Sequence, residues 1–362
     1  MDKKAAIILN ELNVIGGIQI TAMSIAKVLT KMGFRVDVIS ANVNADVTSA
    51  IAETLKIEPN SIKFRLIELP PLASKSTAAY LFSKLVSKLC NEYHLTINAH
   101  GDAQPVPADI VYFHQFNVDY NFRSGNLIRK ITYMPLWHLR KDFLESLKDK
   151  DSLILVNSRW TLSEARKFWA LKRVEVLHPP IVNYEEICKL AGKPRTQNIV
   201  LTISRFSPDR GIERVIDLSK KIHWARFIVA GYVHDRKYFN KLCQQKPNNL
   251  FLYPNVSEGV KLDLLGEAKV YVNPTPYAEG FGIAVAEGMA AGLVPITGDK
   301  GGVREFVPRE YRFTDLEQMS EAIIKSLQEW NVSLATSISR SVSFLSFKGF
   351  KKKLAQMIEG FV

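Results

Sequence analysis

The sequence has few cysteines and no long hydrophobic run. Its three cysteines, Cys90, Cys188 and Cys243, lie far apart, with no CxxC pair and no cysteine–histidine cluster. This pattern excludes a disulfide framework or a structural zinc site and favours a reducing compartment, the cytoplasm. No apolar segment approaches the ~20 residues that span a bilayer. Met1-Asp-Lys-Lys leads directly into a predicted strand, unlike a signal peptide, so we expect a soluble or peripheral protein.

Acidic residues are scarce relative to basic ones. The chain has 48 Lys and Arg against 36 Asp and Glu, a net charge of +12. Such an excess favours a polyanionic partner: a nucleic acid, an acidic membrane surface or a phosphate-bearing substrate. Between Arg123 and Arg173, 12 basic residues stand against 5 acidic ones, which is also compatible with a solvated helical face. Zinc-finger spacing, an RNP motif and a basic helical arm are all missing, so we expect no nucleic-acid partner.

Short apolar runs alternate with helical periodicity in the first half of the chain. Ala5–Leu9 predicts a buried parallel strand, Ile18–Met32 a helix capped by Gly33, and Phe34–Ile39 a second strand. This β–loop–α–β unit starts a doubly wound sheet. Further strands are expected at Ile62–Ile67, Thr96–Ala99, Ile110–Phe113, Leu153–Val156 and Val174–Leu177, with helices that include Thr77–Tyr93 and Leu139–Lys148.

The same pattern restarts in the second half. His178-Pro-Pro-Ile181 ends the first half because prolines cannot continue a strand interior, and we place an irregular linker up to about Asn198. Strands are expected at Ile199–Ile203, Arg226–Ala230, Leu250–Tyr253, Lys269–Val272 and Leu293–Ile296, with helices at Ile212–Lys221, Val260–Ala268 and Phe281–Ala291. We therefore predict an α/β protein of two doubly wound, Rossmann-like domains, 1–190 and 191–344, followed by a helical C-terminus.

Two glycines separate the first strand from its helix. Gly16 and Gly17 would let backbone N–H groups approach an anion at the helix N-terminus. A tight turn that needs a positive φ explains them equally well. The segment is not GxGxxG, and Ile39-Ser40 ends the second strand without an acidic residue, which disfavours a dinucleotide site.

Two arginines follow the first strand of the second half. In Arg205-Phe-Ser-Pro-Asp-Arg210, both guanidinium groups would stand at the carboxyl end of a strand, where α/β sheets bind ligands. Guanidinium groups make planar, bidentate contacts that suit a diphosphate. The alternative is a solvated loop.

Two acidic residues bracket the start of a later helix. Glu279 falls in a loop, and Gly280 and Gly282 open a helix whose free N–H groups face that loop. Glu287 lies two turns on among small apolar residues, where its carboxylate could accept hydrogen bonds from the vicinal diol of a ribose. Glu279 could hold sugar hydroxyls. The alternative is that Glu279 is only a charge at the start of the helix and that Glu287 is an ordinary surface glutamate.

These motifs together resemble a known family. The Glu-x7-Glu spacing within EGFGIAVAEGMAAGLVPI, from Glu279, is similar to the donor signature of retaining GT-B glycosyltransferases, especially family 4, and GGVREFV (Gly301–Val307) resembles the segment that follows it. The glycine pair and the two arginines fall where the family has a glycine pair, an Arg and a Lys. Arg210 therefore has a planar guanidinium group where the family has the compact ammonium group of a lysine. His114 looks like the family's histidine near the donor sugar. Tyr112-Phe-His-Gln-Phe116 and Val176-Leu-His-Pro-Pro-Ile181 resemble the mannosyltransferases of lipid-linked oligosaccharide assembly.

The resemblance implies a fold and an activity. Two Rossmann-like domains would face a central cleft, with 1–190 binding the acceptor, 191–344 binding the nucleotide sugar, and a helix at about 345–362 returning to the first domain. The enzyme would be a hexosyltransferase that retains configuration, needs no cofactor or metal, and favours mannose from GDP-mannose. A DxD, Asp149-Lys-Asp151, lies between a charged helix and a strand, which indicates a solvated turn rather than a metal site.

The resemblance also assigns roles to residues. Catalytic roles fall to Glu279, Arg205, Arg210 and His114, and donor-binding roles to Gly16, Gly17, Gly280, Phe281, Gly282, Ile283 and Glu287. The acceptor would be polyprenyl-phosphate-linked or another glycan. Met134–Lys141 and Thr77–Tyr93 mix apolar and basic residues, as segments on an anionic cytoplasmic membrane face do, although each could equally face the core. Alternatives are a UDP-sugar (glucose or GlcNAc) with a soluble acceptor, and a non-catalytic sugar-nucleotide-binding protein.

Overall fold

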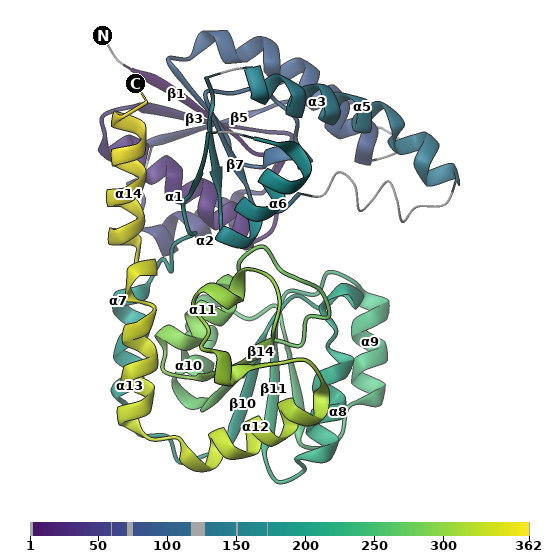
Figure 1. Cartoon of the computed structure of the whole chain (residues 1–362), viewed down its shortest axis with the longest axis vertical. Helices are drawn as coiled ribbons and strands as arrows, with labels where there is room; N and C mark the ends of the chain where they lie inside the picture. The colour runs from purple at the N-terminus through teal and green to yellow at the C-terminus, as the bar shows by residue number, and fades with distance from the viewer. Residues whose placement is uncertain are drawn as a thin grey trace. The chain divides into compact units, whose positions relative to one another are not determined.

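The computed structural model describes residues 3–58, 60–70, 75–116, 127–149, 151–171 and 173–361. The chain forms two compact units, each an α/β structure (Figure 1). The first unit comprises Met1–Val182 together with Phe347–Val362, and the second comprises Asn183–Ser346.

The first unit is built on a parallel sheet. Its strands are β1 (Lys4–Ile8), β3 (Arg35–Ser40), β5 (Ile62–Leu66), β6 (Leu95–Asn98), β7 (Ile110–Phe113), β8 (Leu153–Val156) and β9 (Val174–Val176). They lie in the order β5-β3-β1-β6-β7-β8-β9, and every pairing is parallel. The strand order reverses between β1 and β6, which makes this edge the switch point of a doubly wound sheet. Two short strands, β2 (Glu11–Leu12) and β4 (Asn42–Val43), pair in parallel as a separate two-stranded sheet.

Helices cover both faces of this sheet. They are α1 (Gly17–Lys31), α2 (Ala45–Leu55), α3 (Lys75–Leu89), α5 (Leu127–Asp149), α6 (Arg159–Trp169) and α14 (Phe347–Glu359). Side chains of β1 alternate between two cores: Ile7 packs with α1, α2 and α14, whereas Ile8 packs with α3, α5 and α6. The alternation is the period-two pattern of a strand buried on both faces.

Two predicted segments of the first unit differ from the structure. The helix expected at Leu139–Lys148 begins at Leu127 and contains Pro135. The helix expected at Thr77–Tyr93 ends as α3 at Leu89, and a short 3₁₀ turn follows. In both cases the apolar pattern located the helix but not its ends.

The second unit repeats the plan. Its strands are β10 (Ile199–Ile203), β11 (Arg226–Gly231), β12 (Leu250–Pro254), β13 (Val270–Val272), β14 (Val294–Gly298) and β15 (Arg312–Phe313). They lie in the order β12-β11-β10-β13-β14-β15, all parallel, with the switch point between β10 and β13. The predicted α/β class with doubly wound parallel sheets is confirmed. Only β15, two residues long, escaped the sequence pattern.

The helices of the second unit are α7 (Tyr184–Ile187), α8 (Glu213–Lys221), α9 (Arg236–Gln245), α10 (Glu258–Glu267), α11 (Ile283–Ala290), α12 (Leu316–Glu329) and α13 (Val332–Ser341). The irregular linker expected before Asn198 is instead ordered: α7 and a 3₁₀ helix at Cys188–Gly192 belong to this unit. The Tyr184 hydroxyl donates to the carbonyl of Ser339 at 3.1 Å. The buried Arg195 guanidinium donates to the carbonyls of Ala268 and Ala291. Polar side chains of the segment predicted as a linker therefore donate hydrogen bonds to carbonyl groups at the ends of helices.

Within the described residues, no helix has the length and apolar character needed to cross a bilayer.

Candidate active site

The loops after β10 and β13 carry most of the predicted site residues. Arg205 and Arg210 follow β10, and Asn273 and Glu279 follow β13. These two strands are neighbours on either side of the switch point. Their carboxyl ends therefore form the crevice in which open α/β sheets bind ligands.

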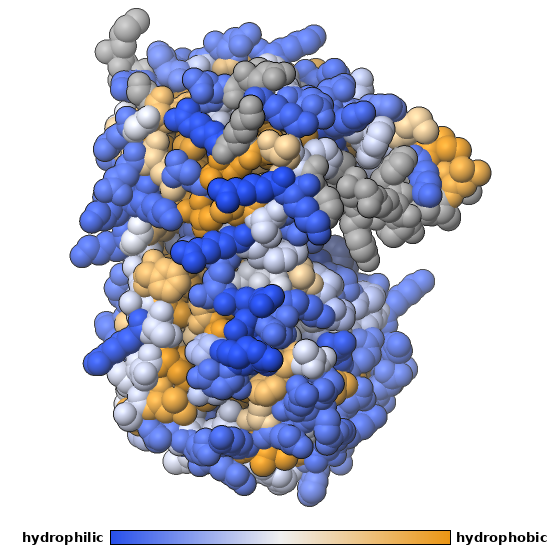
Figure 2. All heavy atoms as spheres, viewed as in Figure 1, coloured by the Kyte–Doolittle hydropathy of each residue, from blue (hydrophilic) through white to orange (hydrophobic). Residues whose placement is uncertain are grey.

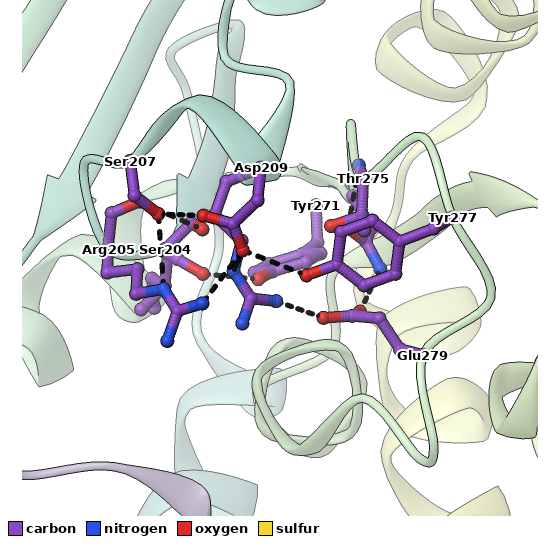
Figure 3. A network of polar contacts seen from close by, with 11 residues as sticks. Ser204, Arg205, Ser207, Asp209, Tyr271, Thr275, Tyr277 and Glu279 are labelled. Carbon is purple, nitrogen blue, oxygen red and sulfur yellow. Dashed lines mark hydrogen bonds and ion pairs between the residues drawn. The ribbon is translucent and has the colours of Figure 1, made fainter. Parts of the chain in front are cut away.

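Glu279 belongs to a polar network that also includes Asp209 and Tyr277 (Figure 3), and it forms an ion pair with Arg210. The Arg210 Nη1 donates to Glu279 Oε1 at 2.5 Å, and Asn273 Nδ2 donates to Glu279 Oε2 at 2.8 Å. Both side chains of the ion pair are mostly buried. A carboxylate with both oxygens held by donors keeps one orientation, which is what a residue that positions a sugar needs.

Arg205 forms the second part of the network together with Asp209, which sequence reasoning did not single out. Arg205 Nη2 donates to Asp209 Oδ2 at 2.7 Å, and Tyr277 donates to the same oxygen at 3.2 Å. Burial by itself would raise the pKa of Asp209, but hydrogen bonds from Ser207 and Arg205 outweigh it and lower the pKa to about 2. Asp209 is therefore ionised at neutral pH and holds Arg205 beside Arg210.

Glycines bring the segment from Gly301 against the Glu279 loop. A Cβ at Gly301, where φ is +75°, would lie 2.4 Å from the Glu279 carbonyl oxygen, and one at Gly302 would lie 2.1 Å from the carbonyl oxygen of Gly280. The Gly302 N–H also donates to the Glu279 carbonyl at 2.9 Å. Glycine is needed at both positions because no side chain fits between the two backbones.

Helix α11 starts later than the sequence predicted. Gly282 is its N-cap, with φ +96°, so the helix begins at Ile283 and residues 279–281 stay in the loop. No side chain caps α11, and its first turn has no acidic residue. The Phe281 side chain is buried and packs against Phe306 with tilted rings, whose centroids lie 4.9 Å apart. Any contact that Phe281 makes with a ligand would therefore use its backbone.

A small pocket adjoins this network. It is lined by Asn273, Thr275, Tyr277, Glu279, Gly298, Lys300 and Val303. Lys300 was not predicted, and its ammonium donates to the carbonyl of Pro276. Burial and the nearby Arg214 lower the pKa of Lys300. The pocket thus combines a carboxylate with a cation that only the fold brings there.

Glu287 lies apart from this network, in a cluster of its own. It projects from the middle of α11 and pairs with Lys261 of α10, with 3.2 Å between Nζ and Oε1. Burial raises the pKa of Glu287, and the Lys261 ammonium lowers it in part. Sequence reasoning missed Lys261, because a lysine in an exposed-looking helix gives no signal of a buried partner.

The predicted residues of the first unit surround its own switch point. Gly16 is the N-cap of α1 with an extended backbone, φ −144°, so the positive-φ explanation for this glycine is wrong. A Cβ there would meet Gln19 Oε1 at 2.8 Å. Gly17 opens α1, and neither a side-chain cap nor an acidic residue occupies the first turn. That leaves a positive helix end available to an anion.

His114 follows β7 and lies close to a second histidine, His100, which follows β6 and was not predicted. The His114 Nε2 donates to the carbonyl of Ala99 at 3.0 Å, which makes Nδ1 its acceptor nitrogen. Burial, together with His100, lowers the pKa of His114 to about 3, and burial with the charge of Arg140 lowers that of His100 to about 4. Both rings are therefore neutral at physiological pH.

Comparisons with known proteins agree with this architecture. A family model described as Glycosyl transferases group 1 matches residues 183–339. The chain is 24% identical over 220 residues to GDP-Man:Man(3)GlcNAc(2)-PP-Dol alpha-1,2-mannosyltransferase of Dictyostelium discoideum, a match that covers 54% of this chain and 43% of that protein. The protein of the same name from Neurospora crassa is 24% identical over 233 residues, 53% of this chain and 42% of its own length. The match thus spans less than half of either relative.

Solved structures resemble the chain over its whole length. WaaG, a glycosyltransferase involved in lipopolysaccharide biosynthesis, has a TM-score of 0.73 at 17% identity, over 98% of this chain and 100% of its own. Anabaena Alr3699/HepE in complex with UDP and glucose has a TM-score of 0.71 at 15% identity, over 99% of each chain. At these identities the likeness establishes the fold, which is that of GT-B glycosyltransferases.

The chain thus has the fold of GT-B glycosyltransferases, and its second unit contains the region that the family model matches. Residues 183–339 match the domain described as Glycosyl transferases group 1, and about half of the chain is homologous to part of the two alpha-1,2-mannosyltransferases.

Proposed function

We propose that the protein transfers a hexose, mannose from GDP-mannose, from a nucleotide sugar to a lipid-linked glycan acceptor with retention of configuration. The observation that carries this proposal is the pairing of Arg210 with Glu279 beside Arg205, at the carboxyl ends of β10 and β13. The pairing combines two cations that suit a diphosphate with a carboxylate that suits sugar hydroxyls.

The two arginines stabilise the leaving diphosphate. As the glycosidic bond breaks, negative charge grows on the departing phosphate, and fixed guanidinium groups at that point lower the barrier. The uncapped N-terminus of α11 adds oriented N–H groups. In this proposal the two guanidinium groups and the helix end take the place of a divalent cation.

If configuration is retained, the state of the nearby carboxylates favours a same-face displacement over a double displacement. A double-displacement mechanism needs a free carboxylate as nucleophile. Arg210 and Asn273 hold Glu279, and Arg205 and Ser207 hold Asp209. In this proposal both acids position other groups, and the acceptor attacks from the face that the diphosphate leaves.

Roles in the first unit belong to the α1 N-terminus and to His114. Gly16 and Gly17 open a helix end without acidic residues, which suits a phosphate or diphosphate. The neutral His114 offers Nδ1 as a hydrogen-bond acceptor for a sugar hydroxyl. In this proposal these residues contact the donor, and the first unit also binds the acceptor.

A membrane-bound acceptor is supported by the N-terminal half of α5. Leu127, Ile131 and Met134 lie on one helical face and are exposed, Leu127 by 74%; Figure 2 shows apolar atoms gathered at that end of the helix. Farther along the predicted membrane segment, Leu136 and Arg140 are buried, so only the first half of α5 is proposed to meet lipid. Liposome co-sedimentation tests this: Leu127→Ser/Ile131→Ser should lose binding to anionic vesicles, whereas unchanged binding would contradict it.

The GDP-mannose assignment rests on the names of the two relatives, which cover only part of this chain. A donor panel of GDP-mannose, UDP-glucose and UDP-GlcNAc with a polyprenyl-diphosphate glycan acceptor tests it by product mass. If only a UDP-sugar is turned over, the donor is that UDP-sugar and not GDP-mannose. If donors bind but none is turned over, the protein is a sugar-nucleotide-binding protein without transferase activity. The anomeric proton coupling of the product reports retention, and a complete, Mn²⁺-reversible loss of activity in EDTA would contradict metal independence.

A further inference from the structure

A buried lysine joins two acidic residues at the side of α11. Lys261 Nζ lies 2.9 Å from Glu258 Oε1 and 3.2 Å from Glu287 Oε1. Lys261 and Glu287 are only 17% and 18% exposed, whereas Glu258 lies nearer the surface. The three groups come from two helices, α10 and α11, so the cluster is a tertiary contact and not a local helix pair.

The cluster is held in place by close backbone packing. Gly288, the neighbour of Glu287, packs on the Tyr271 ring so tightly that a Cβ there would lie 2.8 Å from a ring carbon. The Ser257 Oγ caps the start of α10 by accepting from the Val260 N–H at 3.3 Å. The close approach of Gly288 to Tyr271 fixes α11 against β13, and the cap fixes where α10 begins.

The charges of the cluster do not cancel. Two carboxylates and one ammonium leave a net charge of −1, and the ammonium contacts Oε1 of Glu287. A half-buried acid without a partner would tend to take up a proton and lose half of its acceptor capacity. Lys261 opposes this, because its positive charge favours the ionised form of Glu287.

We propose that Lys261 is a positioning residue for the ribose of the nucleotide sugar: it keeps the Glu287 carboxylate ionised and fixed, so that the carboxylate accepts hydrogen bonds from the ribose diol. This inference rests on the proposed function, since it takes Glu287 as the residue that contacts the donor ribose. Lys261 itself does not touch the donor. Glu258, the outer acid, holds the ammonium from its other side.

The test compares two nucleotides that differ only in the diol. Calorimetry measures the affinity of GDP and of 2′,3′-dideoxy-GDP, with UDP and dideoxy-UDP as a second pair, for the full chain and its variants. Because hydrogen bonds to a charged group are strong, the wild type should bind the complete nucleotide about 10- to 100-fold tighter than its dideoxy analogue. In Lys261→Met the two affinities should converge to within about threefold, and Lys261→Arg should restore the difference.

Lys269→Met is the matched control. Lys269 is also partly buried in the second unit and donates to Asn198 Oδ1 at 2.9 Å, but it precedes β13 at the opposite, amino end of the strand. This variant should keep the wild-type preference for the diol. Because removal of one partner of a buried pair can prevent folding, Lys261→Met/Glu287→Gln is measured as well, and it should fold and show no preference.

The outcomes separate the two proposals. If Lys261→Met folds and keeps the full preference for the diol, the ion pair is merely structural and this inference is overturned while the proposed function stands. Equal wild-type affinity for GDP and its dideoxy analogue would also overturn it, because Glu287 would then not bind the diol. If the wild type binds neither GDP nor UDP, the proposed function itself fails.

Discussion

Arg210 and Glu279 stand 69 positions apart in the chain, yet their side chains meet at 2.5 Å between Nη1 and Oε1. The contact crosses from the loop after β10 to the loop after β13. It couples the residue proposed to meet the diphosphate to the residue proposed to meet the sugar, so a change in either should affect the other.

Glu279→Gln should reduce transfer strongly without loss of the fold. The amide keeps the shape but removes the charge that holds Arg210, and loss of one such positioned group costs about 10²- to 10³-fold in kcat. Initial rates with the preferred donor measure this. Glu267→Gln, at an exposed position of α10, is the control and should leave the rate unchanged. A Glu279→Gln enzyme with the wild-type rate would remove Glu279 from the site.

Arg210→Lys and Arg210→Met should differ. If charge on the leaving diphosphate is what matters, lysine should retain most of the activity, whereas methionine should lose about 2.7–4 kcal/mol of transition-state stabilisation. The comparison of kcat/KM for the three proteins measures this. Equal losses for both variants would show that the fork geometry, and not the charge, is essential.

Gly302→Ala should disrupt the Glu279 loop. The added Cβ would stand 2.1 Å from the Gly280 carbonyl oxygen, and such overpacking costs about 1–3 kcal/mol. We expect a lower Tm together with weaker nucleotide binding, by thermal shift and calorimetry. Gly192→Ala is the matched control, because a Cβ at Gly192 meets nothing within 4 Å. Similar behaviour of the two variants would contradict the close approach.

The free energy of unfolding should fall as the solution becomes acidic. The pKa of His114 is lowered to about 3 and that of His100 to about 4, whereas an unfolded histidine titrates near ~6.5. Between these values the unfolded chain binds more protons, so stability is lost as pH drops below about 6.5. Urea unfolding at about pH 7.5 and about pH 5.5 measures this slope.

The control for this prediction is a pair of variants. His100→Gln/His114→Gln should flatten the dependence on pH, while the exposed His223→Gln should leave it as in the wild type. An unchanged slope in the double variant would mean that other groups cause the acid sensitivity.

Some of the site could be predicted because strand ends and glycines are local signals. An apolar run places β10 and β13, and parallel strands bring their carboxyl ends to one sheet edge, so Arg205, Arg210 and Glu279 could be expected near each other. The glycine segment from Gly301 could be recognised only through family resemblance. The physical reason for these glycines is that an added Cβ would lie 2.1–2.4 Å from a carbonyl oxygen of the Glu279 loop. This close approach can be seen only in the folded chain.

The partners of individual charged side chains could not be predicted. Asp209 is ordinary in sequence until Arg205, Ser207 and Tyr277 converge on it, and Lys261 looks like a solvated helix residue until Glu287 is found beside it. In the segment Met134–Lys141 the core-facing alternative holds for Arg140, which is buried and donates to the Tyr133 hydroxyl at 2.8 Å.

The sequence by itself determined the α/β class, the repeated doubly wound plan and the Glu-x7-Glu spacing from Glu279 to Glu287 that resembles a donor signature, since periodicity, glycine positions and motif spacing are properties of the chain. Tertiary structure alone decided which charges pair: Arg210 with Glu279, Asp209 with Arg205, and Lys261 with Glu287. The physical reason is that ion pairing depends on distance and burial, and both are set only when separate strands and helices come together.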